Sequence, residues 1–271
     1  MSFNTLALVA VGGLFSPARA DGLDEIRRAG EIRVGVVTDI APFGYIDPKT
    51  QLVAGYDIDF AKFVAQQLGV KVAFTVLQRD DRLPALKEKR VDLVVAALIN
   101  APERAKEVDM SYSYFVSVPK IAAKAGRFSE LSQLQAARIC APKGSFLLSV
   151  IKEALPAATP VISDTNVQAF QNLMKGDCDA VAGSAAALRH QLQRMPADSG
   201  LEVPDIPLSM KRLSMAVHKD ETRLLDAVNA ALLQAEKSGK AIRMFERHFG
   251  KQSVAPQMRA FKIYADTVKA E

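Results

Sequence analysis

The sequence predicts an α/β protein of two doubly wound lobes with a ligand cleft between them, because one order of strands and helices occurs twice. The first copy lies in residues 32–96 and the second in residues 138–182. Each copy reads strand, helix, strand, helix, strand, which calls for right-handed crossovers and a parallel sheet with helices on both faces. Ligands of such sheets lie beyond the carboxyl ends of the strands, so two facing lobes share one site.

The first copy is marked by apolar runs and by helical periodicity. Its expected strands cover residues 32–37, 71–77 and 91–96, and its expected helices cover residues 57–68 and 83–89. In the longer helix, Ile58, Ala61 and Val64 recur on one face at helical spacing. The last strand is apolar along most of its length, which indicates that it is buried.

The second copy repeats this order. Its expected strands cover residues 138–141, 160–162 and 179–182, and its expected helices cover residues 146–155 and 166–175. A further strand at residues 213–218 and two amphipathic helices at residues 224–236 and 240–249 are expected to return the chain to the first lobe.

These elements give a discontinuous first lobe. We expect lobe one to comprise residues 21–117 and 214–271 and lobe two to comprise residues 118–213, with crossings near residues 116–122 and 213–217. The tail from residue 250 onward is too short to be a domain and is expected to pack along a lobe.

The N-terminal residues read as an export signal. Residues 6–15 are apolar and precede Ala18-Arg19-Ala20, the small-residue pattern of a cleavage site, although no Lys or Arg precedes the apolar run. About ten apolar residues are too few to cross a bilayer core, which needs roughly twenty. We therefore expect a signal peptide at residues 1–20 and a periplasmic mature chain.

Composition and motifs exclude several classes of function. The net charge is +5 with 49% apolar residues, and no basic run carries interleaved aromatics, so nucleic-acid binding has no support. His190, His218 and His248 form no pair at ligand spacing, which argues against a metal site. The sequence has no nucleotide-binding loop and no G-x-S-x-G elbow, so no cofactor is expected. Cys140 and Cys178 suit an oxidising compartment and form either a disulfide or two independent buried thiols.

Arg104 is a candidate anion ligand because it follows the last strand of the first copy. Pro102 suits the first position of a helix, and a helix N-terminus at the end of a strand favours an anion. The guanidinium fork of Arg104 fits a carboxylate in two hydrogen bonds. The alternative is that Arg104 pairs with Glu107 or another surface acid.

Ser145 occupies the equivalent place in the second copy. Gly144 permits a tight turn, and Ser145 is a good helix N-cap, so the serine and the amides that follow it could grip the same carboxylate. The alternative is an N-cap with no ligand, which by itself explains the serine.

Several segments in order carry a resemblance to a known family. They are G-V-V-T-D-I-A-P-F-G-Y from Gly35, G-Y-D-I-D-F-A from Gly55, R-L-P-A-L from Arg82, V-D-L-V from Val91, P-E-R ending at Arg104, and V-D-M-S from Val108. From about residue 30 to residue 250 the chain resembles the bacterial extracellular solute-binding proteins of family 3, the polar amino acid receptors of ABC importers. The Arg82 motif, the short spacing from Asp39 to Pro42 and the tail are most similar to the glutamate/aspartate-binding branch.

The resemblance implies a type II periplasmic-binding-protein fold that closes on its ligand by hinge motion, as a monomer that partners a membrane permease. It implies that Arg104 holds the ligand α-carboxylate and that Ser145 completes this grip. It also implies that Tyr56 packs on the ligand side chain, that Asp39 touches this side chain, and that Arg82 contacts a side-chain carboxylate.

The chain departs from the family pattern at Ser184 and ahead of the P-E-R motif, and from the acidic branch at Val37, where that branch has an arginine. Ser184 stands where the family has an Asp that pairs with the ligand ammonium, and Ile99 and Ala101 leave only Asn100 polar ahead of the P-E-R motif. A buried ammonium without a carboxylate partner is costly. Either the ligand has no α-ammonium, or another acid such as Asp39 supplies the charge.

Two rival functions share this fold. One is a periplasmic lyase resembling cyclohexadienyl dehydratase, whose chemistry needs an acid in the cleft, but residues 145–149 and Ser184 offer no carboxylate. The other is a receptor that reports its ligand to a sensor rather than to a transporter. Neighbouring permease and ATPase genes would distinguish that receptor from a transport protein.

The expected signal peptide leads to a direct prediction. The protein recovered from the periplasmic fraction should have the intact mass of a chain beginning at Asp21, because the Ala18-Arg19-Ala20 pattern places cleavage after Ala20. An uncleaved product confined to the cytoplasm would contradict it.

Overall fold

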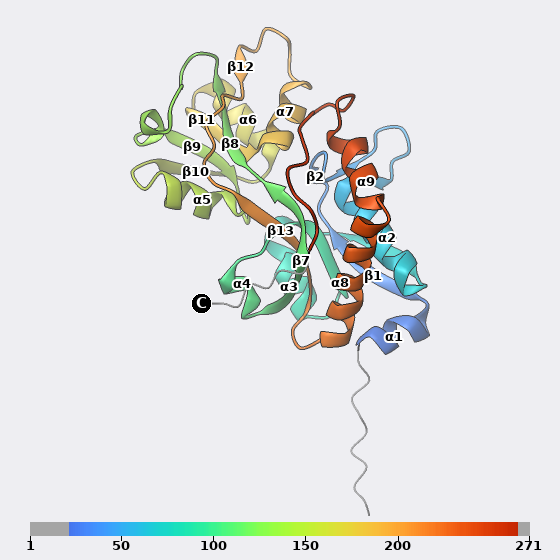
Figure 1. The fold of residues 1–271 in the computed structure, drawn as a ribbon. Coiled ribbons are helices and arrows are strands. Elements are labelled where there is room, and N and C mark those ends of the chain that lie inside the picture. The colour runs from blue at the N-terminus through green and yellow to red at the C-terminus, as the bar shows by residue number, and fades with distance from the viewer. Residues whose placement is uncertain (1–21, 265–271) are drawn as a thin grey trace, which may run out of the picture.

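The computed structural model describes residues 22–264, and it has two lobes joined by extended strands (Figure 1). Each lobe is built on a five-stranded sheet, in the order β5-β1-β6-β13-β7 for lobe one and β10-β9-β11-β8-β12 for lobe two. The predicted two-lobed α/β fold is therefore confirmed. The expected signal peptide lies outside the described residues.

Lobe one contains most of the helices. Its main strands are β1 (Glu31–Val36), β5 (Lys71–Val76), β6 (Leu93–Ile99), β7 (Val108–Ser117) and β13 (Lys211–His218), and a small sheet holds β2 (Asp39–Ile40), β3 (Gly44–Ile46) and β4 (Val53–Ala54). Its helices are α1 (Gly22–Ala29), α2 (Tyr56–Leu68), α3 (Arg82–Lys87), α4 (Pro102–Ala105), α8 (Thr222–Lys237) and α9 (Lys240–Phe249), with a 3-10 turn at Arg79–Asp81.

Lobe two is smaller. Its strands are β8 (Pro119–Lys124), β9 (Arg138–Pro142), β10 (Thr159–Ser163), β11 (Ala180–Ser184) and β12 (Leu201–Glu202). Its helices are α5 (Leu147–Ala154), α6 (Asn166–Lys175) and α7 (Ala185–Leu192), with a 3-10 turn at Leu131–Leu134.

The sheets are mixed rather than wholly parallel as the repeat suggested. Strands β5, β1 and β6 are parallel, but β13 runs antiparallel to both β6 and β7. In lobe two, β8 is antiparallel to both β11 and β12. The reason is the connection between the lobes: β7 continues almost directly into β8, so the returning strand β13 must run the opposite way beside β7.

The lobe boundaries lie where strands change sheet. Ser117 ends β7, and Pro119 begins β8, within the first expected crossing. On the return, the Leu208 amide donates to the carbonyl of Pro119 at 2.8 Å, and Lys211 already pairs with Ser117 in the sheet of lobe one. The segment at residues 213–217 is therefore part of strand β13, and the chain changes lobes just ahead of it.

An aromatic cluster forms the centre of lobe one. The ring centroid of Tyr56 lies 4.9 Å from that of Phe60, 5.5 Å from that of Phe115 and 5.2 Å from that of Phe249. The tight approach at Gly55 sets the start of α2, since a Cβ there would lie 2.1 Å from the Phe43 carbonyl oxygen. Helices α8 and α9 cover the same face as α2 (Figure 1), so elements from both ends of the chain make one core.

The described part of the C-terminal tail packs along lobe one, as expected. Arg259 pairs with Glu236 of α8 through its Nη1, 3.0 Å from Oε1, and the Ile263 amide donates to the same carboxylate. The Phe261 ring lies 5.3 Å from that of Phe115. No helix among residues 22–264 is long and apolar enough to cross a membrane.

The two cysteines form a disulfide. The sequence alone was compatible with either a disulfide or two independent buried thiols. Cys140 in β9 and Cys178 just ahead of β11 have Cα atoms 5.8 Å apart and are buried against Phe170 and Leu173 of α6. The bond joins two neighbouring elements of the lobe-two sheet across 38 residues of chain.

Reduction of this bond should destabilise lobe two. Closing a loop of this length removes chain entropy from the unfolded state worth about 4 kcal/mol. Urea unfolding followed by circular dichroism should give a lower midpoint for the wild type with a reductant, and for Cys140→Ser/Cys178→Ser with or without it. Equal midpoints for the oxidised and reduced wild type would contradict the disulfide.

Candidate functional site

A small cavity lies between the two lobes. It encloses about 30 Å³. Its walls are Ile40, Phe43, Arg79, Arg82, Ala97, Ser117, Ser145, Phe146, Leu147, Asn166, Gly183, Ser184, Ala187 and Leu213. A second cavity of about 240 Å³ shares Asn166, Gly183 and Ala187 with it and reaches Asp39. We refer to these as the cleft cavity and the adjoining cavity.

The topology of the sheets explains this location. Arg79 follows the carboxyl end of β5 in lobe one, and Asn166 and Ser184 lie at the carboxyl ends of β10 and β11 in lobe two. The two doubly wound sheets thus direct their carboxyl ends to one cleft.

A buried carboxylate holds the backbone of the cavity wall at Ala97. The amide of Ala97 donates to Asp57 Oδ2 at 2.8 Å, and the Tyr114 hydroxyl donates to Asp57 Oδ1 at 2.7 Å. Ala97 has a positive φ of 46°, an uncommon conformation for a residue with a Cβ. Burial raises the pKa of Asp57 to about 6, against the lowering effect of these two hydrogen bonds.

Arg82 is buried and connects the lobes. Its Nε donates to the Arg79 carbonyl at 2.7 Å, its Nη1 to the Ala96 carbonyl at 2.8 Å, and its Nη2 to the Gly144 carbonyl of lobe two at 2.8 Å. Burial lowers its pKa to about 9, and repulsion from Arg104 and Arg79 adds to this shift. Arg82 was expected to contact a side-chain carboxylate of the ligand. In this structure the side chain lines the cavity, but its main partners are backbone carbonyls.

Arg79 reaches the cavity from the turn that precedes α3. Its Nε donates to Asp39 Oδ2 at 2.9 Å, and its side chain is only 9% exposed. Burial lowers the pKa of Arg79, and Asp39 partly offsets that effect. Asp39 therefore serves first as the partner of an arginine.

Further contacts between the lobes close the cleft. Asn166 Nδ2 of lobe two donates to the Asp39 carbonyl at 2.7 Å, and Lys143 pairs with Asp80 at 3.1 Å. Gly144 allows a close backbone approach between the lobes, because a Cβ there would lie 2.7 Å from the Asp80 amide nitrogen. The structure is thus a closed arrangement of the two lobes.

The two expected lobe-two hydroxyls both line the cavity. The Ser145 hydroxyl donates to the Pro142 carbonyl at 2.6 Å, and Phe146 rather than Ser145 occupies the N-cap position of α5. The expected N-cap role of Ser145 is therefore replaced by a turn contact. Ser184 is the N-cap of α7, where its Oγ accepts from the Ala187 amide at 3.2 Å.

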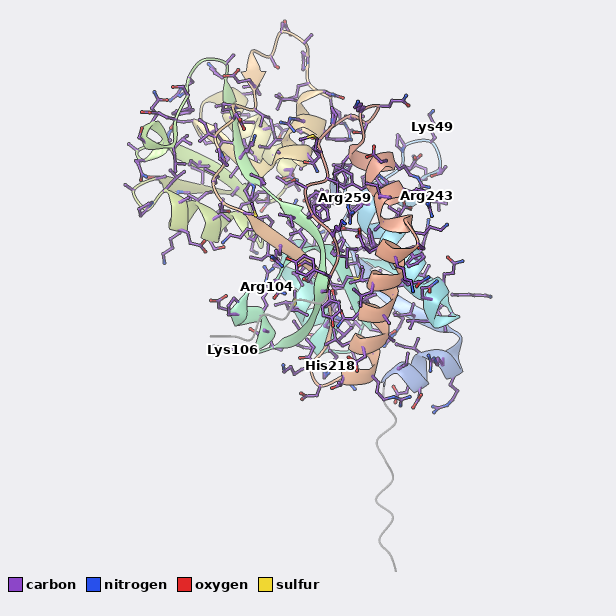
Figure 2. The ribbon with its side chains drawn as sticks, viewed as in Figure 1. Lys49, Arg104, Lys106, His218, Arg243 and Arg259 are labelled. Carbon is purple, nitrogen blue, oxygen red and sulfur yellow. A yellow bond between two sulfur atoms is a disulfide. The ribbon has the colours of Figure 1, made fainter. Side chains whose placement is uncertain are left out.

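Besides Asp39, which lies at the adjoining cavity, three expected site residues do not line the cleft cavity. Tyr56 is fully buried in the aromatic core, and its hydroxyl donates to the Tyr114 carbonyl at 3.0 Å, so it packs on other rings rather than at the cleft. Asn100 is exposed. Arg104 is half-buried on the side of lobe one that faces lobe two (Figure 2), and its Nη1 donates to the Ile99 carbonyl at 3.1 Å.

Three polar residues of the cavity were not predicted from the sequence, namely Arg79, Ser117 and Asn166. Arg79 and Asn166 follow the ends of β5 and β10, so the strand-end rule applied to every predicted strand would have found them. Ser117 lies at the strand change between the lobes and carried no motif. Among residues 22–264 no group of three or more His, Cys, Asp or Glu side chains is arranged to hold a metal ion.

Comparisons with known proteins agree with this architecture. Residues 32–251 match the bacterial extracellular solute-binding proteins, family 3. The ABC transporter arginine-binding protein 1 of Escherichia coli (strain K12) is 28% identical over 223 residues, which cover 82% of this chain and 91% of that protein. An ancestral arginine-binding protein bound to glutamine is 31% identical with a TM-score of 0.75, covering 82% of this chain and 99% of that one. An ancestral amino acid-binding protein, a precursor of cyclohexadienyl dehydratase, is 30% identical with a TM-score of 0.76, covering 84% and 99%.

The structural role of Arg82 can be measured without any ligand. Arg82→Met should lower the free energy of unfolding by about 2–4 kcal/mol, because it leaves buried carbonyls without their charged donor. Arg90→Met is the matched control, since Arg90 forms only exposed ion pairs with Asp81 and Glu88, and it should change stability by less than about 1 kcal/mol. Equal losses of unfolding free energy in the two variants, measured by urea unfolding, would refute this structural role of Arg82.

Proposed function

We propose that this chain, which belongs to the bacterial extracellular solute-binding proteins of family 3, captures a small carboxylate-bearing solute in the periplasm and delivers it to an ABC transporter permease. The observation that carries the proposal is the cavity between the lobes, which is lined by the largely buried Arg79 and the buried Arg82 together with polar residues of lobe two. Positive charge in a site closed to water suits an anionic group of a small molecule.

The proposed mechanism is capture by closure. In an open state, the segment that joins β7 to β8 and the segment ahead of β13 would act as hinges. Lobe two would then move away from lobe one as a rigid body. The solute would neutralise the arginine side of the cleft, after which the Gly144 and Asp39 carbonyls could engage Arg82 and Asn166. A permease would then recognise the closed form.

The relatives favour an amino acid or a related acid. The names of two relatives state that they bind arginine or glutamine, two solutes that differ in side chain and share an α-carboxylate. The shared carboxylate, rather than either side chain, is what we carry over to this chain.

We propose, on the basis of the family resemblance, that Arg104 binds that α-carboxylate. It lies close enough to Arg82 to lower the pKa of that side chain. To reach a solute, its guanidinium would exchange the Ile99 carbonyl for a carboxylate oxygen, which is a stronger partner for a cation.

A lyase function has less support. Proton transfer to a leaving hydroxyl needs an acid in the cavity, and no Asp or Glu is among the residues that line the cleft cavity. Asp39 in the adjoining cavity is already paired with Arg79. We therefore propose binding without turnover.

Carboxylate capture can be tested by a thermal-shift screen of amino acids and organic acids, followed by calorimetry on the best solute. At about 100 times its Kd, a solute should stabilise the protein by about 2.7 kcal/mol, and its methyl ester should not. Arg104→Ala should weaken binding by about 30-fold or more, and Arg104→Lys should recover little, since a point charge cannot form the fork. Binding of the ester as tightly as the acid would contradict the proposal.

A further inference from the structure

Two buried polar atoms of the cleft cavity have no hydrogen-bond partner. They are Arg79 Nη2 and Ser117 Oγ, and both of their residues line this one cavity. Within the described chain, the other such side-chain atoms belong to Ser209, Ser253 and Arg259, none of which lines it. An unpaired buried donor is costly, more so on a charged group, so a pair of them facing one space indicates a site that a bound molecule completes.

The other polar side chains of the cavity already have partners. Arg82 donates to three carbonyls, Asn166 donates to the carbonyl of Asp39, and the hydroxyls of Ser145 and Ser184 are engaged by Pro142 and Ala187. A solute therefore gains most by meeting the two unpaired atoms.

The charge of the walls favours an anion. Arg79 and Arg82 contribute two buried cations, and no Asp or Glu lines the cleft cavity. The Asp39 carboxylate, which lies at the adjoining cavity, partly neutralises the charge of Arg79. The ammonium of a zwitterion would meet no carboxylate in the cleft cavity, whereas a second acidic group would meet Arg79.

Building on the proposed function, we propose that Arg79 and Ser117 contact the solute directly and select a short acid of net negative charge over neutral and cationic amino acids. Arg79 keeps its Nε on Asp39 and donates from Nη2 to a carboxylate oxygen. Ser117 Oγ donates to a second oxygen of the solute. The cleft cavity is small, so the solute is short or extends into the adjoining cavity.

The selectivity is tested by calorimetry with four kinds of probe: succinate and malate, aspartate and glutamate, asparagine and glutamine, and arginine. The acids should bind at least about 10-fold more tightly than the matching amides, because a neutral amide leaves the arginine charge uncompensated. Tighter binding of glutamine, asparagine or arginine would overturn this inference and leave carboxylate capture intact. If none of the carboxylate probes bound, both this inference and the proposed carboxylate capture would be overturned.

Two variants assign the contacts. Arg79→Gln should reduce the affinity for the best acid by about 30-fold or more and that for its amide by much less, so the ratio of the two affinities should fall. Ser117→Ala should reduce the affinity for the acid by about 5- to 10-fold with no change in fold, since it removes one hydroxyl. Arg90→Gln is the control and should leave both affinities unchanged, because its ion pairs are exposed.

A purely structural role for Arg79 would lower the affinities for acid and amide alike. An unchanged ratio in Arg79→Gln, with an unfolding curve like that of the wild type, would therefore reject its role in selectivity. Unchanged acid binding in Ser117→Ala would reject the second contact, and this variant stays informative if Arg79→Gln does not fold.

Discussion

The buried guanidinium of Arg82 is the contact on which the closed arrangement depends. It joins the carbonyls of Arg79 and Ala96 in lobe one to that of Gly144 in lobe two. A buried cation is costly unless its donors are satisfied, so removing any one carbonyl would destabilise the closed arrangement. Gly144 is required on the other side, since a Cβ there would collide with the backbone at Asp80.

This contact links closure of the lobes to the charge of the solute. Arg79, Arg82 and Arg104 lie near one another on lobe one, and burial lowers the pKa of each. Closing the cleft without an anion concentrates this charge in a medium of low dielectric. An acid in the cavity would relieve the repulsion as the lobes meet, and its binding would favour closure over opening.

Much of the fold followed from the sequence because periodicity is a local signal. The βαβαβ order, the carboxyl-end location of the site and the placement of Ser145 and Ser184 at one cavity all rest on strands and helices that local patterns mark well. The antiparallel return of β13 was not foreseen, because strand direction depends on how the chain passes between the lobes.

Side-chain roles were harder to read than positions. Tyr56 shares a motif with a helix start, but whether an aromatic ring faces a cleft or a core depends on neighbours such as Phe249, which is distant in sequence. Arg82 was expected to contact the ligand, yet the three backbone carbonyls that accept its hydrogen bonds come together only once the lobes fold and meet. The Cys140–Cys178 pairing likewise required knowing that β9 lies beside β11.

The most direct test of the account is the distance between the lobes as the solute binds. Spin labels introduced through unnatural amino acids at exposed Lys49 in lobe one and Asp198 in lobe two would report it by pulsed electron resonance. The account predicts a broad, longer distance without solute and a single shorter one with a saturating acid, and incomplete shortening in Arg82→Met. Tight binding of the acid with no change in this distance would contradict capture by closure.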